Sequence, residues 1–308
     1  GKRLLTTPRH YAYLKIADGC SNCCTYCAIP LIRGKYRSRK MEDIIAQAKE
    51  LAQGGAKELI LIAQDTTRYG QDIYDKLMLP ELLRELCKIE DVKWIRLLYC
   101  YPERVTNELI ETIASEEKIL NYIDLPLQHV SENILKMMNR TGNAKTLREL
   151  INKLRAKIPD IVLRPTFIVG FPSETEENFE ELCNFANEVQ FDRMGCFTYS
   201  PEENTKAALF ENQVSEEIKL KRQEILMEQQ NLILERKCNS LPGKNVLALI
   251  DGFDETKGCL FGRSYMDLPD VDIRIMLEHE ADKNLIGKFK KLQITSYDGY
   301  DLYGKIAD

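Results

Sequence analysis

The stretch "ADGCSNCCTYCAIP", residues 17–30, places four cysteines within eight positions, directly after an apolar, strand-like run. Three of them, Cys20, Cys24 and Cys27, have the spacing C-x3-C-x2-C, and Cys23 is the surplus thiol. Three thiolates on one loop can hold three irons of a cubane [4Fe–4S] cluster and leave the fourth iron open to a small molecule. The spacing therefore predicts an iron–sulfur site in this loop.

The same four thiols allow other interpretations. Counted as two C-x2-C pairs, they could close a four-thiolate zinc site, and a redox pair would use the same residue type. The loop follows the first strand of a predicted parallel barrel, where catalytic loops gather, and this position favours the cluster. The remaining cysteines are distant in sequence, and most lie in apolar patterns typical of ordinary buried thiols: Cys87, Cys100, Cys183, Cys196, Cys238 and Cys259.

Composition is that of a globular protein large enough for two domains, with 308 residues, 44% hydrophobic and 30% charged. No apolar run approaches the roughly 18 residues that suggest a membrane span, and the start "GKRLLTTPRH" does not resemble a secretory signal. We therefore expect a cytoplasmic protein with no membrane partner. Thiols stay reduced there, so ten cysteines favour ligation over disulfides.

Six short apolar runs alternate with helix-like patterns over the first two-thirds of the chain, which predicts an α/β fold with a parallel sheet. The expected strands are 13–18, 58–64, 94–100, 122–127, 162–170 and 193–200. The expected helices are 41–53, 78–89, 106–117, 131–139, 144–157 and 175–189. Ser173 is the predicted N-cap of the last helix, with Glu176 in capping-box spacing. Six units predict a partial barrel with its site at the carboxyl ends of the strands.

The last third of the chain changes character. A long helical pattern at 215–238 opens with Ser215 as the expected N-cap, and five short alternating strands follow it. Such strands predict a small five-stranded antiparallel β-barrel like an OB-fold. We therefore expect a partial barrel at 1–214, a connecting helix at 215–240 and a substrate-capture barrel at 241–308.

The pattern C-x3-C-x-aromatic-C, with Tyr26 as the aromatic residue, resembles the signature of radical S-adenosylmethionine (SAM) enzymes. The resemblance covers nearly the whole chain and implies a partial (β/α)6 barrel with two cofactors, a [4Fe–4S] cluster and SAM. In this family the cluster cleaves SAM reductively, and the resulting radical abstracts hydrogen from an unactivated carbon. The cofactors supply this chemistry, and the protein positions them and keeps water away.

The resemblance also implies SAM contacts at the strand ends, and in each case an ordinary strand-end turn is the alternative. Tyr26 would pack on the adenine. The motifs "AQDTT" (63–67), "PLQH" (126–129) and "FIVGFP" (167–172) supply the other expected contacts: Gln64, Asp65, Thr66, Gln128, His129 and Gly170.

The segment "IPLIRGKYRSRK" (29–40) resembles the methylthiotransferases within this superfamily, and the final small barrel resembles their TRAM module. The strings "AQDTTRYG" (63–70) and "GRSYMDLPDVD" (262–272) resemble the ribosomal-protein branch (RimO-type) rather than the tRNA branch. The implied target is the β-carbon of an aspartate in small-subunit ribosomal protein twelve. The arginines Arg33, Arg37 and Arg39 are either carboxylate anchors, SAM's carboxylate included, or a solvated turn.

Charge supports the same branch. Residues 241–308 hold nine basic and twelve acidic side chains, a net charge of −3, which suits a basic ribosomal protein better than tRNA phosphates. Two alternatives stay open: a tRNA adenosine methylthiotransferase, and a non-catalytic cluster or zinc protein that binds RNA.

The resemblance implies two further partners in the reaction. An N-terminal domain with three more cysteines would hold a second [4Fe–4S] cluster, and a flavodoxin-like or ferredoxin-like protein would donate electrons. No cysteine precedes Cys20, so we expect this chain to bind and cleave SAM without completing sulfur insertion.

Overall fold

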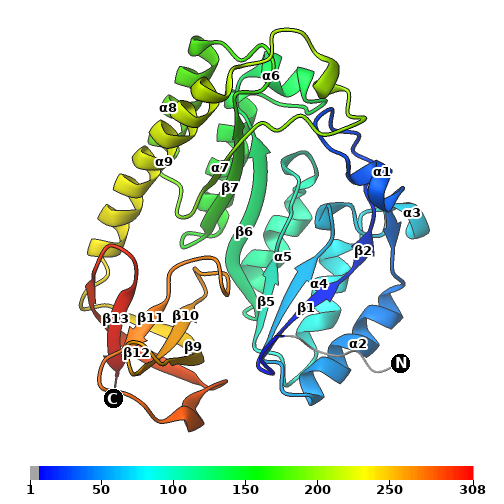
Figure 1. Ribbon diagram of the computed structural model, residues 1–308. Helices are drawn as coiled ribbons and strands as arrows, with labels where there is room; N and C mark the ends of the chain where they lie inside the picture. The colour runs from blue at the N-terminus through cyan, green and yellow to red at the C-terminus, as the bar shows by residue number, and fades with distance from the viewer. Residues whose placement is uncertain (1–6, 308) are drawn as a thin grey trace.

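The computed structural model describes residues 7–307, so the predicted domain bounds at residues 1 and 308 lie outside the described part (Figure 1). Six parallel strands form one open, curved sheet in the order β1-β4-β5-β6-β7-β8. They are β1 (Tyr11–Lys15), β4 (Glu58–Ile62), β5 (Trp94–Leu97), β6 (Ile119–Gln128), β7 (Val162–Val169) and β8 (Gly195–Thr198). The predicted partial (β/α)6 barrel is confirmed.

Helices connect the strands and cover the outer face of this sheet. They are α2 (Met41–Gln53), α3 (Gln71–Tyr74), α4 (Leu79–Cys87), α5 (Asn107–Ser115), α6 (Glu132–Met137), α7 (Ala144–Lys157) and α8 (Glu176–Val189). The amphipathic pattern explains their packing: α2 buries Ile44, Ala48 and Leu51, which share one face of the helix, against strand residues such as Leu14 and Leu59. None of the helices described is long and apolar enough to cross a membrane.

The predicted N-cap at Ser173 is wrong. Helix α8 begins at Glu176 and is capped by Thr175, whose hydroxyl accepts the N–H of Asn178 in a reciprocal capping box. Ser173 instead has a left-handed backbone, with φ of 64°. The chain cannot enter the helix earlier because the buried Glu174 carboxylate turns back to accept the N–H of Gly170.

The cysteine loop is framed by short elements that periodicity did not reveal. Strands β2 (Ala17–Asp18) and β3 (Arg37–Ser38) pair antiparallel, and α1 (Ile29–Arg33) lies between them in sequence. Single 3-10 turns occur at Thr66–Arg68, Pro102–Arg104, Ala207–Leu209 and Lys283–Leu285. Elements this short carry no repeat long enough to read from sequence.

A long helix, α9 (Glu216–Asn239), leads from the sheet to the C-terminal barrel, and Ser215 caps it as predicted, by accepting the N–H of Ile218 (Figure 1). The barrel is closed by β9 (Asn245–Asp254), β10 (Cys259–Ser264), β11 (Ile275–Leu277), β12 (Phe289–Tyr297) and β13 (Leu302–Ile306). The prediction of a wholly antiparallel barrel is wrong, because β11 and β13 run parallel. Five strands cannot alternate direction around a closed ring, so one neighbouring pair must be parallel.

The C-terminal barrel packs against the sheet near the amino ends of β1 and β5. Tyr11, Trp94 and Tyr122 from the sheet form one buried cluster with Leu249 and Leu268 of the barrel. The concave face is thus closed at one end, and the carboxyl ends of the strands, with the cysteine loop, remain at the other.

Candidate cofactor site

The cysteine loop is fixed from three directions by main-chain hydrogen bonds. Thr25 N–H donates to Met138 O at 3.1 Å, at the end of α6, and Ala207 N–H donates to Thr25 O at 2.9 Å. Cys20 N–H donates to Gly34 O at 3.1 Å, just after α1. These bonds position the cysteine loop against α6, α1 and the turn at Ala207.

Within this loop the four thiols differ in exposure. Cys20 and Cys24 are buried, Cys27 is partly buried, and Cys23 is exposed with a left-handed backbone, at φ of 56°. The pKa of Cys20 and of Cys27 is raised, chiefly by burial and further by the neighbouring Cys24. Three thiolates gathered there need positive charge to offset them, which the irons of a cluster supply.

The zinc interpretation needs four thiolates around a single ion. In the part of the chain that the structure describes, no three His, Cys, Asp or Glu side chains come close enough together to hold one metal ion. A cubane takes one thiolate per iron, at separate corners, so Cys20, Cys24 and Cys27 fit a cluster better than a single tetrahedral ion.

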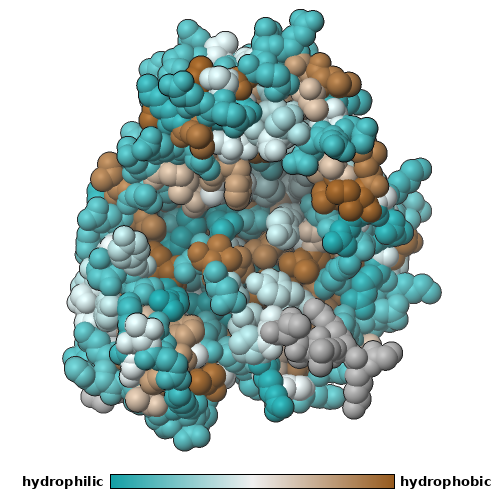
Figure 2. All heavy atoms as spheres, in the orientation of Figure 1, coloured by the Kyte–Doolittle hydropathy of each residue, from teal (hydrophilic) through white to brown (hydrophobic). Residues whose placement is uncertain are grey.

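A cavity of about 460 Å³ lies beside the loop, at the carboxyl ends of β1, β4 and β5. Cys20, Cys27, Gln64, Tyr99 and Tyr101 are among the residues that line it. Figure 2 shows the concave face of the molecule hollowed near its centre, above the C-terminal barrel. The cavity can therefore hold a small molecule in contact with the thiols.

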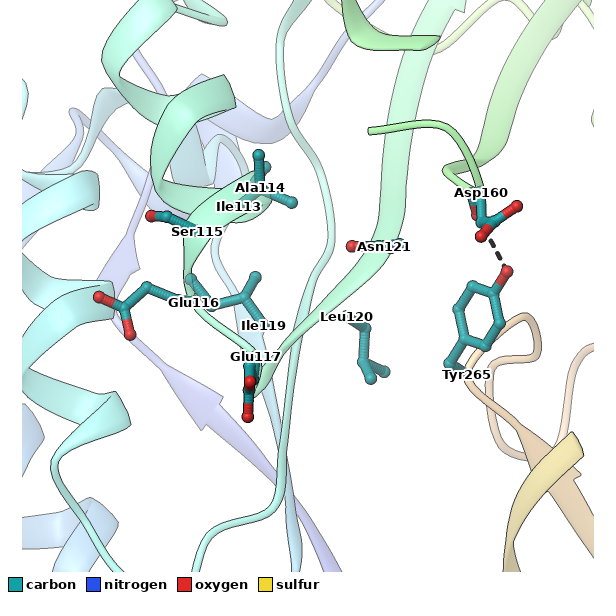
Figure 3. Close-up of a pocket in the computed structure, with 10 residues that line it drawn as sticks. All are labelled: Ile113, Ala114, Ser115, Glu116, Glu117, Ile119, Leu120, Asn121, Asp160 and Tyr265. Carbon is teal, nitrogen blue, oxygen red and sulfur yellow. Dashed lines mark hydrogen bonds between the residues drawn. The ribbon is translucent and has the colours of Figure 1, made fainter. Parts of the chain in front are cut away.

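A second cavity of about 410 Å³ lies at the opposite end of the sheet, near the start of β6 (Figure 3). Glu116, Glu117 and Tyr265 line it, and the Tyr265 hydroxyl donates to Asp160 O at 2.9 Å. No cysteine lines it, so we place the candidate site in the cavity beside the cysteine loop.

Two glutamines at strand ends carry acceptors that lack a partner among the described residues. Gln64 Oε1 and Gln128 Oε1 are both buried without a hydrogen bond. Gln128 ends β6 with φ of 69°, an uncommon backbone conformation for a residue other than glycine. Gln64 lines the cavity beside the cysteine loop, and Gln128 is not among the residues that line it. A buried acceptor such as Gln64 Oε1 fits a ligand that brings N–H or O–H donors, as the amino and ribose groups of SAM do.

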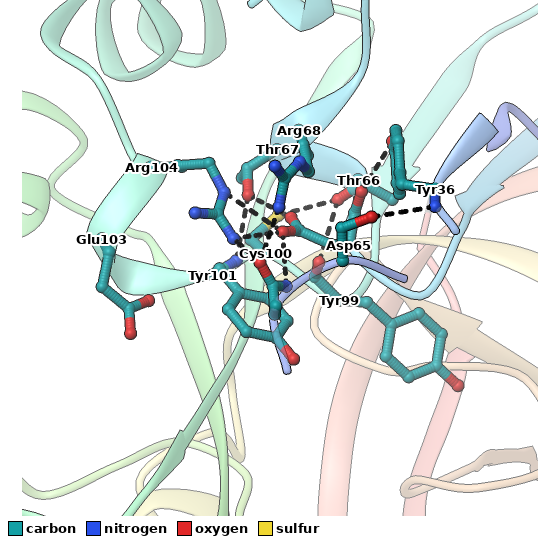
Figure 4. A network of polar contacts seen from close by, with 12 residues as sticks. Tyr36, Asp65, Thr66, Thr67, Arg68, Tyr99, Cys100, Tyr101, Glu103 and Arg104 are labelled. Atoms are coloured by element: carbon teal, nitrogen blue, oxygen red, sulfur yellow. Dashed lines mark hydrogen bonds and ion pairs between the residues drawn. The ribbon is translucent and has the colours of Figure 1, made fainter. Parts of the chain in front are cut away.

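Asp65 and Thr66, predicted to contact SAM, are instead the centre of an internal network (Figure 4). The Asp65 carboxylate accepts from Arg104 Nη2 at 2.6 Å and from Asn22 Nδ2 at 2.9 Å. Thr66 Oγ1 donates to Leu98 O at 2.7 Å. Their polar atoms are thus engaged in joining the cysteine loop to β4 and β5, and SAM contact by either residue stays a prediction.

Replacing Asp65 by alanine is expected to lower the free energy of unfolding by about 3 kcal/mol, because Arg104 would lose its buried carboxylate partner. Asp91→Asn, which removes the charge from an exposed pair with Lys57, is the control and should change stability by less than about 0.5 kcal/mol. Urea denaturation of the two variants measures the difference. Equal effects would mean that the Asp65 network does not stabilise the fold.

His129 and Gly170 also lie in a packed region. His129 is fully buried, its Nδ1 accepts the N–H of Ser131 at 3.0 Å, and its Nε2 faces Glu174 at 3.5 Å. A Cβ on Gly170 would lie 2.2 Å from Cγ of Lys219 on α9, so the close approach at this glycine is with α9. Direct SAM contact by either residue stays a prediction.

Tyr26 packs edge-to-face on Phe171, with ring centroids 6.5 Å apart, and burial raises the pKa of its hydroxyl. Beside it, the Arg140 guanidinium stacks on Tyr101 at 4.4 Å, and the Tyr101 hydroxyl lies 3.8 Å from Cys24 Sγ. Neither Tyr101 nor Arg140 was predicted from the sequence. The run "YCYPER" (99–104), directly after a predicted strand, was the available signal for Tyr101.

The three arginines after the loop have separate roles. Arg39 donates to Lys15 O at 2.7 Å, and Arg37 donates to Lys35 O at 3.0 Å, so both stabilise the turn. Only Arg33 of the three lines the cavity. Arg33 is therefore the one of the three that is placed to anchor a carboxylate in the cavity, and Arg37 and Arg39 are engaged within the turn.

Comparisons with known proteins agree with this geometry. A model of the radical SAM superfamily matches residues 14–186, and a model of the TRAM domain matches residues 243–307. Among solved structures, the radical SAM enzyme coproporphyrinogen III oxidase (HemN) from Escherichia coli is similar over 96% of this chain and 71% of its own, with a TM-score of 0.54 and 16% identity. At that identity the likeness shows the fold alone.

Two curated relatives define the family more closely. The ribosomal protein uS12 methylthiotransferase RimO of Caldanaerobacter subterraneus subsp. tengcongensis is 55% identical over 304 residues, which cover 98% of this chain and 69% of that protein. The RimO of Thermoanaerobacter sp. is 53% identical over 305 residues, 99% of this chain and 69% of that protein. The chain therefore belongs to the radical SAM superfamily and, within it, to the RimO family of iron–sulfur, SAM-dependent methylthiotransferases.

Proposed function

We propose that this chain is the radical SAM and TRAM part of an enzyme that adds a methylthio group to the β-carbon of an aspartate in ribosomal protein uS12. The observation that carries the proposal is the 55% identity to a RimO over 98% of the chain, joined to a cysteine triad at the carboxyl end of β1. The aspartate β-carbon comes from the family resemblance of the sequence.

The chain's own residues fit both cofactors. Cys20, Cys24 and Cys27 would hold the cluster, and Gln64 and Gln128 would accept hydrogen bonds from SAM. When bound, these groups supply the one-electron chemistry that activates an unreactive C–H bond. Hydrogen bonds at both flanks position the cysteine loop, and the burial of Cys20 and Cys24 keeps bulk water from the thiols.

We also propose a function for each part of the chain. Residues 1–214 bind the cofactors, 215–240 connect, and 241–308 capture the substrate in the cytoplasm. The second cluster of the family would lie in the part of the relatives that this chain does not cover, and a flavodoxin-like or ferredoxin-like protein would supply the electron.

The test is product analysis with the chain reconstituted anaerobically with iron, sulfide and SAM, beside a full-length relative. The full-length enzyme is expected to yield methylthio-aspartate in uS12, and this chain only products of SAM cleavage. Mass spectrometry of the uS12 peptides checks both results. Methylthio-aspartate formed by this chain alone would contradict the limit that we propose for it.

The tRNA alternative is tested in the same reactions. An adenosine methylthiolated in tRNA, with uS12 unchanged, would replace the proposed substrate. Binding measured across salt concentrations adds a second criterion, since contacts to tRNA phosphates weaken steeply as salt rises.

A further inference from the structure

The cavity beside the cysteines carries an excess of positive charge. Of its eleven lining residues, Lys15 and Arg33 are cationic and none is a carboxylate. Lys15 is the last residue of β1, on the same face as Tyr11 and Tyr13, which pack against the concave side of the sheet. Its ammonium group therefore stands at the carboxyl edge of the sheet, where the cavity opens.

The carboxylate of Asp18 pairs with both cations at the edge of the cavity. Lys15 Nζ lies 2.9 Å from Asp18 Oδ2, and Arg33 Nη1 lies 3.6 Å from Asp18 Oδ1. Asp18 also accepts the N–H of Gly19 at 2.9 Å. A single negative charge shared between two cations leaves one positive charge uncompensated. The Lys15 and Arg33 side chains are 42% and 49% exposed, so a ligand can reach both.

We propose that Lys15 and Arg33 form a carboxylate subsite that receives the side chain of the target aspartate. This inference rests on the proposed function and adds how the substrate is recognised. The β-carbon of an aspartate is bonded directly to its carboxyl carbon, so a carboxylate held by Lys15 and Arg33 keeps the reacting carbon in the same cavity as Cys20 and Cys27.

The same contact gives specificity for the charged residue. Asparagine offers the two cations a neutral amide oxygen in place of a charged carboxylate oxygen. It therefore loses the Coulomb attraction that aspartate gains, and it would be bound less well than aspartate. SAM has a carboxylate of its own. The chemistry that the subsite recognises is therefore a carboxylate, and the two sources are separated by measuring both ligands.

The experiment uses the reconstituted chain and two fluorescent peptides. One spans the uS12 segment modified by the full-length enzyme, and the other has asparagine at the target position. Lys15→Met and Arg33→Gln remove each charge, and Lys49→Met, on the exposed side of α2, is the matched control. Fluorescence anisotropy gives the peptide affinities, and equilibrium dialysis with labelled SAM gives the cofactor affinity. Iron content and thermal melting confirm that each variant is loaded and folded.

We expect wild type and Lys49→Met to bind the aspartate peptide about tenfold more tightly than the asparagine peptide, and Lys15→Met to lose most of that preference, with SAM affinity unchanged. A preference that survives both substitutions overturns the inference and leaves the proposed function standing. Loss of SAM binding with the preference intact also overturns it, because the cations would then serve the cofactor. If wild type binds SAM but neither peptide, the proposal that uS12 is the substrate is contradicted, and the carboxylate subsite is contradicted with it.

Discussion

Cys24→Ser will abolish assembly of the [4Fe–4S] cluster, and Cys23→Ser, one residue away, will leave it intact. The pair is informative because the two thiols are adjacent and differ in placement: Cys24 is buried beside Tyr101, and Cys23 is exposed. A hydroxyl is a much poorer ligand for iron than a thiolate, so a cubane that relies on three thiolates loses a corner.

Iron and sulfide analysis after anaerobic reconstitution measures this effect. Wild type and Cys23→Ser should each hold about four irons per chain with the broad visible absorption of a cubane, and Cys24→Ser close to none. Thermal melting of the apoproteins controls for folding, since neither substitution removes the main-chain bonds at Thr25 and Cys20. Full iron content in Cys24→Ser, or its loss in Cys23→Ser, would reassign the ligands.

Sequence predicted the fold well where the signal is local and periodic. The run of apolar residues in β4 and the buried face of α2 both follow directly from spacing, and strand–helix alternation then allows few topologies. The cysteine spacing was equally local. A parallel pair somewhere in the C-terminal barrel was also within reach, because a closed ring of five strands requires one, but parity does not say that the pair is β11 with β13.

The parts that sequence did not reveal depend on contacts between distant residues. Asp65 looks like a ligand contact from its motif, yet Arg104, 39 positions away, engages its carboxylate.

The net charge of −3 for residues 241–308 likewise omits the contacts that these charges make with the rest of the chain. Asp267 pairs with Arg193, and Asp272 with Arg164, so both carboxylates are turned toward the sheet. A count of charges cannot distinguish a face offered to a partner from one buried against the chain itself.

The second large effect is expected where the two barrels meet. Glu58, at the start of β4, is fully buried, accepts from Arg96 Nε at 2.8 Å and lies 2.5 Å from Arg263 Nη1 of β10. Arg263 in turn pairs with Asp251 at 2.8 Å. Glu58→Gln keeps the shape and removes the charge, which leaves the buried Arg96 without its carboxylate partner and Arg263 with Asp251 alone. Loss of one partner from a buried ion pair costs about 3–5 kcal/mol.

Urea denaturation will measure this loss, with Glu85→Gln, which neutralises the exposed pair with Lys88, as the control at less than about 0.5 kcal/mol. Adding Arg263→Met to Glu58→Gln should cost less than the sum of the single changes, because the second substitution removes a charge that the first left unpaired. Strict additivity would mean that the Glu58–Arg263 pair does not couple the barrels.

The pH dependence follows from the same cluster. Burial pushes the pKa of Glu58 upward, but the charges of Arg263 and Arg96 outweigh it and hold the pKa below its ordinary value of 4.5. The stabilisation is therefore complete above pH 4.5 and is lost as the pH falls through the lower pKa of the folded state. The difference in the free energy of unfolding between wild type and Glu58→Gln should be constant near neutrality and should narrow in acid.

Glu58 and Arg263 come from different barrels, so the Glu58→Gln variant should also unfold in two steps where wild type unfolds in one. A single unchanged transition would show that the apolar contacts of Trp94 and Leu249 suffice to join the two barrels.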